Sequence, residues 1–373
     1  MPYDRNDLLA QDAMVNELLR PLAEFLRIPH ATEIVVNRPG EVFVEAGPSW
    51  SRHDAPALTI ERCSSLANAI ASYTSQRIDA QTPLLSAQLP GGQRIQIVAP
   101  PAVERDTVSL TIRIPDAATR SFNAYESDGF FGRYLWSRRD AVPAREKCLT
   151  AAQRTLMQHL EHSRLAQFLV DAVRAKQNVV FVGDTGCGKT SLMKAACQYI
   201  PEDERLITIE DVREIYLDQH PNRVHLLYSK SGQRDWAVTP SDLIASAMRM
   251  KPDRVLLAEL RGAEAFDFLK LLTTGHSGSI SSFHAESCAL ARERYVFMCK
   301  EHPHAAIYGA DALKQLVTLT IDVIVHIAVE RHDGEYGAPP RKERYVSEVY
   351  YDPLAKLDAR FGQGVIHRAE SMS

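Results

Sequence analysis

The chain has 373 residues, 45% of them hydrophobic and 24% charged, which is the composition of a globular protein of two or three domains. A net charge of −4 leaves no basic footprint for general nucleic-acid binding, and no apolar run is long enough to span a bilayer. Six cysteines without a CxxC pair argue against a zinc ribbon or a disulfide framework and indicate reduced thiols. We expect a soluble, cytoplasmic protein without a signal peptide that reaches the inner membrane only through partners.

The first third of the chain predicts a compact α+β domain over residues 1–115. Apolar residues recur at helical spacing over 8–26, where Pro21 interrupts them, and again over 58–77. Runs typical of strands make up the rest, as two hairpins and one further strand: 33–45, 84–98 and 108–114.

Residues 116–150 differ in composition from the segments on either side and predict an inter-domain linker. The segment is polar and contains glycine, but aromatic residues such as Phe122, Tyr125 and Trp136 are scattered through it. That content is too aromatic for a freely solvated tether, so we expect these side chains to dock on a neighbouring surface.

From residue 151 to 373 the pattern becomes an alternation of strands and helices, which predicts an α/β domain with a mainly parallel sheet. The expected strands are 178–182, 205–209, 224–228, 254–260, 279–283, 321–329 and 344–351. The expected helices are 151–175, 240–250, 263–273, 286–301 and 308–318, with another after residue 191. The tail from 352 onward gives no pattern.

The segment Val179–Ser191 is the central motif, because a short apolar run leads directly into Gly-x-x-x-x-Gly-Lys-Thr. A buried strand, a glycine-rich turn and a helix N-terminus in this order are what a phosphate-binding P-loop requires. Lys189 is placed to reach the β- and γ-phosphates of a nucleotide, and Thr190 to hold Mg²⁺. The predicted nucleotide-binding residues are Gly183, Asp184, Thr185, Gly186, Cys187, Gly188, Lys189, Thr190 and Ser191.

Carboxylates follow two of the predicted strands, where ligands lie in such sheets. Glu210 and Glu214 come after the strand at 205–209, and Glu259 lies near the end of an apolar strand. A buried strand accepts an ionised glutamate only when a cation or donor compensates it, and Mg²⁺ next to Thr190 would do so. Glu210 has an alternative reading, as a helix-capping acid or a salt-bridge partner.

Histidines mark a third segment, 274–285. His276 lies between glycines and His284 ends a strand, so either side chain is placed to hydrogen-bond a γ-phosphate or to have a structural role. His302 and His304 read as a solvated turn rather than a metal site.

Four motifs in this order resemble those of the secretion-ATPase family of hexameric P-loop motors, specifically the traffic ATPases of bacterial type IV secretion systems. They are a Walker A motif at 183–190, an acidic box at 208–214, a Walker B segment with Glu instead of Asp at 256–262, and a histidine box at 274–285. Segments 37–41, 92–98 and 109–115 resemble the family's N-terminal domain. The long linker is similar to that of the branch in which linker and N-terminal domain pack over a neighbouring subunit.

The resemblance implies a C-terminal RecA-like ATPase domain and an N-terminal α+β domain of PAS-like fold. It implies hydrolysis of Mg-ATP between subunits of a homo-hexameric ring, which energises substrate export and pilus assembly. Other secretion-system components of the inner membrane and cytoplasm are the implied partners.

The resemblance also implies roles for individual residues. Glu259 would assist at the metal or its water, and Glu210 or Glu214 would polarise the attacking water. His284, with His276 behind it, would report the γ-phosphate. Arg94 and Arg113 lie in segments that match the part of the family's N-terminal domain that brings arginines to the phosphates, with surface salt bridges as the alternative role.

Three alternatives differ in what they require. An assembly ATPase of type II secretion or pili usually carries a tetracysteine zinc loop, which this chain lacks. A small-molecule P-loop kinase needs an arginine-rich lid, and none stands out after the histidine box. A nucleotide-gated scaffold that does not hydrolyse ATP would not need Lys189, Thr190 and Glu259 intact.

Overall fold

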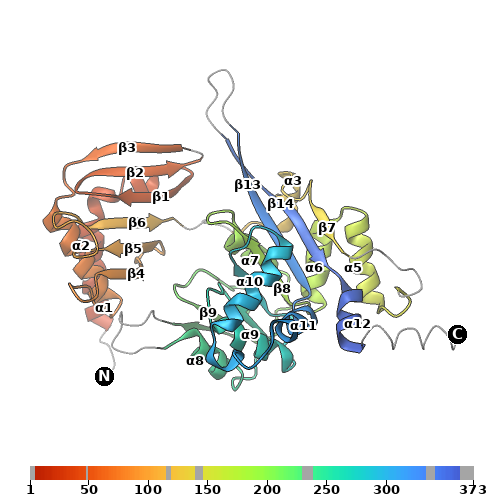
Figure 1. The fold of residues 1–373 in the computed structure, drawn as a ribbon. Coiled ribbons are helices and arrows are strands. Elements are labelled where there is room, and N and C mark those ends of the chain that lie inside the picture. Colours follow the sequence, from red (N-terminus) through yellow and green to blue (C-terminus); the bar gives the residue numbers. More distant parts are fainter. Residues whose placement is uncertain are drawn as a thin grey trace.

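Two sheets, each with its own helices, organise the chain into two lobes with a cavity between them (Figure 1). The computed structural model describes residues 5–47, 49–114, 119–138, 146–228, 238–332 and 341–361. Within these residues, no helix is both long and apolar enough to cross a membrane.

The first lobe contains an antiparallel sheet of six described strands in the order β3-β2-β1-β6-β5-β4. Strand β5 alternates buried and partly buried side chains, as expected for a sheet with one face on the core. The strands are β1 (Ala31–Val36), β2 (Gly40–Ala46), β3 (Ser49–Ala55), β4 (Leu84–Gln88), β5 (Arg94–Val98) and β6 (Ser109–Arg113).

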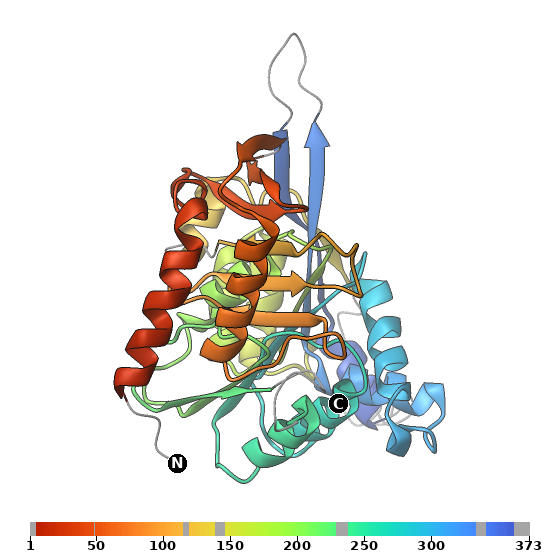
Figure 2. The same cartoon turned by 90° about the vertical axis from the view of Figure 1, so that its left-hand side faces the viewer.

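Two helices cover the face of this sheet that points away from the second lobe (Figures 1 and 2). They are α1 (Arg5–Leu19) and α2 (Ile60–Tyr73), and the short helices η1 (Arg20–Leu22) and η2 (Phe25–Arg27) follow α1. Pro21 lies in η1, so the predicted interruption is confirmed. The opposite face of the sheet is thereby left to face the second lobe.

The second lobe is built on a sheet of eight described strands in the order β10-β9-β11-β12-β8-β13-β14-β7. The six from β10 to β13 are parallel, β14 runs antiparallel to β13, and β7 pairs parallel with β14. The strands are β7 (Leu135–Ser137), β8 (Val179–Gly183), β9 (Leu206–Glu210), β10 (Arg223–Leu227), β11 (Arg254–Leu257), β12 (Ile280–Phe283), β13 (Val323–His332) and β14 (Arg341–Tyr351).

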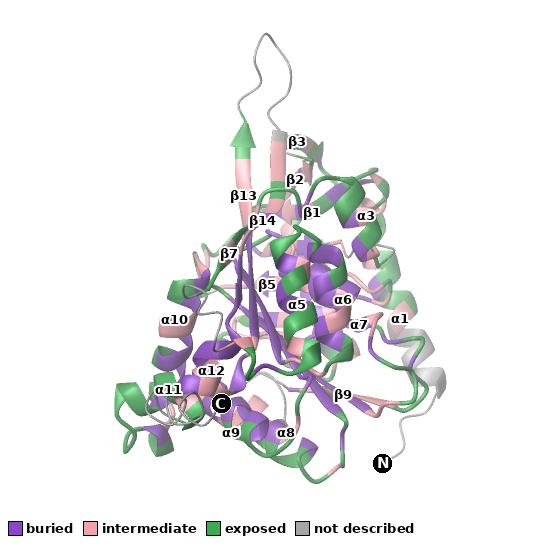
Figure 3. Cartoon of the chain, turned by 90° about the vertical axis from the view of Figure 1, so that its right-hand side faces the viewer, coloured by how far each residue is buried: buried purple, intermediate pink, exposed green. Residues whose placement is uncertain are grey.

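Helices cover both faces of this sheet, and its central strands are buried (Figure 3). One core joins α5, α6, α7 and α12 to one face, and a second joins α8 to α11 to the other. Alternate residues of β8 point into the two cores, which explains its unbroken apolar run. The helices are α5 (Ala151–Glu161), α6 (Leu165–Arg174), α7 (Lys189–Cys197), α8 (Pro240–Ala247), α9 (Glu264–Thr273), α10 (Cys288–Lys300), η3 (Pro303–Ala305), α11 (Ala310–Thr320) and α12 (Pro353–Phe361).

The predicted linker contributes directly to the second lobe. Helix α3 (Phe122–Ser127) puts Phe122 and Tyr125 into its core, where the Phe122 ring stacks on Tyr199 at 4.9 Å. Strand β7 extends the second sheet beside β14. The prediction that these aromatic side chains dock on a neighbouring surface is therefore confirmed. The domain limits at 115 and 151 remain a prediction.

Candidate functional site

The P-loop lies at the carboxyl end of β8, between that strand and α7. Gly183 ends β8 with φ of 151°, and a Cβ there would lie 2.4 Å from the carbonyl oxygen of Ile327 on β13. Only glycine tolerates this approach. Gly188 precedes α7 in the left-handed conformation and has no side chain, so the first N–H groups of the helix are not capped by a side chain. Those donors and the positive end of the helix dipole suit a phosphate group.

Lys189 is buried beneath the loop and is only 8% exposed. Its ammonium donates to the carbonyl oxygens of Gly183 at 3.0 Å and Asp184 at 2.8 Å, and lies 3.3 Å from Nδ1 of His284. Burial lowers the pKa of Lys189 from its ordinary value, because a buried ammonium loses hydration. A triphosphate beside this group would replace that lost hydration with negative charge.

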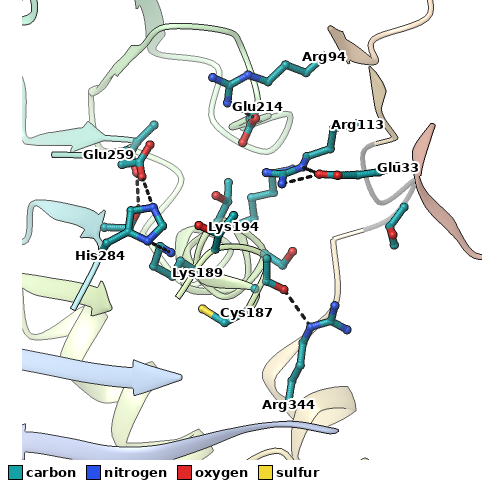
Figure 4. A pocket seen from close by; sticks show the side chains of 18 of the residues that line it. Glu33, Arg94, Arg113, Cys187, Lys189, Lys194, Glu214, Glu259, His284 and Arg344 are labelled. Carbon is teal, nitrogen blue, oxygen red and sulfur yellow. Dashed lines mark hydrogen bonds and ion pairs between the residues drawn. The ribbon is translucent and has the colours of Figure 1, made fainter. Parts of the chain in front are cut away.

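The loop opens onto a cavity of about 1070 Å³ between the two lobes. Residues from both lobes line it, and Figure 4 shows ten of them labelled around the P-loop. The structure brings these predicted residues together at its wall: Arg94, Arg113, Thr185, Gly186, Cys187, Gly188, Lys189, Thr190, Ser191, Glu214, Glu259 and His284. Gly183 and Asp184 do not line the cavity, but their carbonyl oxygens accept hydrogen bonds from the ammonium of Lys189.

A chain of ion pairs connects the first lobe to the predicted Walker B glutamate. Arg94 on β5 pairs with Asp211 at 2.7 Å and with Glu214 at 3.0 Å. Arg261 pairs with the same oxygen of Asp211 at 3.1 Å and holds Glu259 at 2.6 Å. Burial opposes the charge on both arginines, but these carboxylates outweigh it and raise the pKa of each.

Glu259 continues this chain to the P-loop. Its second oxygen lies 3.0 Å from Nε2 of His284, whose other ring nitrogen faces the ammonium of Lys189. Glu259 comes just after β11 and His284 just after β12, and both strands run parallel to β8. The carboxyl ends of parallel strands meet at one edge, which is why motifs far apart in the sequence converge here.

The two predicted arginines of the first lobe lie directly opposite each other on neighbouring strands, Arg94 on β5 and Arg113 on β6. Both side chains therefore leave the same face of the sheet and enter the cavity (Figure 4). Glu33 on β1 accepts from Arg113 at 2.7 Å. Each arginine is thus already held by an acid, which orients its guanidinium.

Two predicted catalytic residues lie outside the cavity. Glu210 is fully buried and accepts from the backbone N–H groups of Glu214 at 2.8 Å and Ile215 at 2.9 Å. Its carboxylate therefore shapes the loop that carries Glu214 instead of facing a substrate; no helix begins there, so it is not the helix cap of the alternative reading. His276 precedes β12 at the opposite edge of the sheet and contacts Thr274 at 3.1 Å. The strand separates it from His284, so the idea that it stands behind that residue is wrong.

His302, which was expected in a solvated turn, is partly buried. Its ring packs on Phe266 at 5.1 Å and lies 3.4 Å from a carboxylate oxygen of Asp267.

Several cavity residues carried no signal in the sequence. Glu33, Lys342 and Arg344 line the wall but belong to ordinary strand patterns outside the four motifs. Asp211 and Arg261 do lie inside motifs, yet only the fold shows that Asp211 pairs with Arg94 of the first lobe and that Arg261 connects Asp211 to Glu259.

This set of groups fits a nucleotide with a divalent cation. The loop, the helix N-terminus and Lys189 suit phosphates, while the hydroxyl of Thr190 and the carboxylate of Glu259 are oxygen ligands of the kind that Mg²⁺ prefers.

Comparisons with known proteins point the same way. The chain is 42% identical over 365 residues to the type IV secretion system protein VirB11 of Brucella suis, which covers 95% of this chain and 97% of that protein. This chain belongs to the VirB11 family of type IV secretion ATPases. A second member, the type IV secretion system protein PtlH of Bordetella pertussis, is 40% identical to this VirB11-family chain. The match covers 91% of this chain and 96% of PtlH. The family model described as type II/IV secretion system protein matches residues 150–327.

Solved structures agree with this assignment. The crystal structure of the VirB11 ATPase from the Brucella suis type IV secretion system, in complex with sulphate, is 41% identical, covers 95% of this chain and 99% of that one, and gives a TM-score of 0.51. The ATPase DotB of Legionella pneumophila covers 97% of this chain and 87% of its own, with 16% identity and a TM-score of 0.59. At that identity DotB supports the fold alone. The predicted pairing of a RecA-like ATPase domain with an N-terminal α+β domain is confirmed.

Proposed function

We propose that this VirB11-family chain hydrolyses Mg-ATP in the cavity between its lobes and uses the cycle to drive type IV secretion and pilus assembly. The observation that carries the proposal is the convergence of the P-loop, Glu214, Glu259, His284 and the arginines of the first lobe on one cavity. Charged groups from both lobes then meet at the phosphates, so closure of the lobes and hydrolysis depend on each other.

Within this proposal each residue has a defined task. The P-loop N–H groups and Lys189 bind the β- and γ-phosphates, and Arg94 and Arg113 stabilise the charge that develops on the transferred phosphoryl group. Glu214 orients the attacking water and accepts its proton, because it faces the cavity whereas Glu210 does not. His284, between Lys189 and Glu259, reports whether the γ-phosphate is present.

Thr190 and Glu259 would hold Mg²⁺, directly or through water. Bound there, the ion would supply positive charge that offsets the negative charge of the phosphates.

We further propose that six copies of the chain form a ring, as the family resemblance implies, and that this ring contacts the inner membrane through other secretion components. Rigid-body movement of one lobe against the other would convert hydrolysis into work on those partners.

The experiment that tests the proposal compares Lys189→Ala with the wild-type chain. We expect Lys189→Ala to abolish steady-state ATP hydrolysis, because the phosphate-bridging charge is lost. Lys300→Ala is the matched control, since Lys300 is an exposed residue of α10 outside the cavity wall. Phosphate release is measured without any added acceptor, which also separates an ATPase from a kinase. Hydrolysis at the wild-type rate by Lys189→Ala would refute the proposal.

A further inference from the structure

The hairpin of β13 and β14 extends beyond the other strands of the second sheet, alongside the first lobe (Figures 1 and 2). Near its outer end the ammonium of Lys342 on β14 forms an ion pair with Glu45 on β2. Both side chains are largely buried, at 16% and 15% exposure, so solvent screens this pair less than a surface pair. Glu45 is also held within its own lobe, because its other oxygen accepts from Thr32 at 3.2 Å.

Two residues further along the same strand, Arg344 reaches the P-loop. Its Nε donates to the carbonyl oxygen of Gly186 at 3.0 Å (Figure 4). Successive side chains of a strand point to opposite faces, so Lys342 and Arg344 leave β14 on the same face. One face of β14 thus contacts the first lobe through Lys342 and the P-loop through Arg344.

The hairpin is anchored on a third side by the segment between the lobes. Arg133 pairs with Glu330 on β13 at 2.9 Å and with Glu343 on β14 at 3.2 Å. The guanidinium of Arg133 also lies 3.9 Å from the ring centre of Tyr345. These contacts of Arg133 join both strands of the hairpin to the segment between the lobes. Lys342 and Arg344 therefore extend from a strand that is itself held in place.

We propose that Lys342 and Arg344 are positioning residues for ATP hydrolysis: Arg344 holds the P-loop at Gly186, and Lys342 sets the first lobe in register with that loop. The inference rests on the proposed function and adds two residues outside its motifs.

The physical basis of the inference is the geometry of the loop and of the first lobe. Gly186 is an exposed loop residue with φ of 72° and open space around its missing Cβ, and its carbonyl oxygen accepts the hydrogen bond from Arg344. Arg94 and Arg113 project from the sheet that contains β2, so a shift of that sheet moves both guanidinium groups relative to the phosphates. A misplacement of about 1 Å at such groups can cost on the order of a hundredfold in rate.

The test separates the two contacts by what each variant changes. We expect Arg344→Gln to weaken binding of a fluorescent ATP analogue about tenfold, because the loop loses a charge-assisted hydrogen bond. Arg344→Lys should recover part of that loss. We expect Lys342→Glu to lower kcat about tenfold with little change in KM, because it shifts the lobe arginines and leaves the loop intact.

A charge swap decides whether Lys342 acts through Glu45. The double variant Lys342→Glu with Glu45→Lys should return kcat to within about threefold of the wild type, since it rebuilds the pair with reversed signs. Lys300→Glu is the control for a reversed charge, because Lys300 is exposed on α10 and does not line the cavity. Hydrogen exchange of residues 184–188 gives a readout without hydrolysis, and we expect faster exchange in Arg344→Gln.

Three results would overturn the inference: unchanged exchange in Arg344→Gln, single variants that behave like Lys300→Glu, or a swap no better than Lys342→Glu alone. A wild-type chain that binds nucleotide but never hydrolyses it would instead refute the proposed function.

Discussion

Glu210 and Glu214 show how one acidic motif contains two carboxylates with different tasks. Glu210 ends β9 and Glu214 follows it four residues later, and the sequence alone offered each as the group that activates water. The fold separates them, because Glu210 turns inward to accept two backbone N–H groups while Glu214 turns into the cavity beside Arg94. A buried carboxylate that accepts hydrogen bonds from the backbone N–H groups of a loop has a structural role, even when it lies in a catalytic motif.

The two glutamates should therefore respond differently to the same substitution. We expect Glu214→Gln to lower the rate of ATP hydrolysis by about 10²–10⁴, as for loss of a general base, with nearly unchanged thermal stability. We expect Glu210→Gln to lower the free energy of unfolding by about 1–3 kcal/mol, because the amide satisfies its buried partners less well than a carboxylate. Thermal unfolding and single-turnover hydrolysis of both variants check this contrast. The reverse pattern would assign the water-activating role to Glu210.

At the scale of elements, much of the second lobe was predictable because its strands are buried on both faces and read as apolar runs. The P-loop strand, the strands before Glu210 and Glu259, and the helices between them match the structure closely. Strand β3 was missed because its exposed residues, Ser49–Ala55, lack an apolar face. Helix α12 was missed as well, and the expected helix 151–175 divides into two at Ser163, which has a positive φ.

The candidate site was predictable only in part, for a physical reason. Residues such as Lys189 and His284 lie in local motifs, whereas the contact of Arg344 on β14 with Gly186 in the P-loop joins residues 158 positions apart. No local pattern encodes such a contact. The same holds for the ion pairs that connect Arg94 to Glu259 through Asp211 and Arg261.

A close contact between the start of β11 and the residue before β12 leads to a further prediction. Arg254 at the start of β11 is fully buried, pairs with Glu204 at 2.6 Å and donates to the carbonyl of Val173 at 2.6 Å. Gly278, just before β12, has φ of 84°, and a Cβ there would lie 2.7 Å from the guanidinium of Arg254.

We expect Gly278→Ala to lower the free energy of unfolding by about 2 kcal/mol or more, since it adds backbone strain and displaces a buried charge. Denaturant unfolding measures the change. Gly309→Ala is the control, because its φ is negative and nothing lies near its missing Cβ. Equal effects of the two substitutions would contradict this reading.

At the scale of the whole molecule, the lobes meet mainly through charged groups around the cavity. Arg94 joins Asp211 and Glu214, Lys342 joins Glu45, and Gln88 donates to the carbonyl of Arg213 at 3.1 Å. Polar contacts of this kind are exchanged more easily than a packed apolar interface, which suits a molecule whose lobes must move during a cycle. The fold thus places the chemistry where the two lobes can separate.

Hydrolysis by the double variant Arg94→Ala with Arg113→Ala, measured as single turnover of bound ATP, tests the central claim most directly. The account predicts that this variant binds nucleotide through its intact P-loop but hydrolyses it about 10²–10³ times more slowly than the wild type. The control is Arg38→Ala with Arg52→Ala, two exposed arginines of the same lobe that pair with Glu41 outside the cavity. Wild-type hydrolysis by the Arg94 and Arg113 variant would contradict the claim that both lobes form the catalytic site.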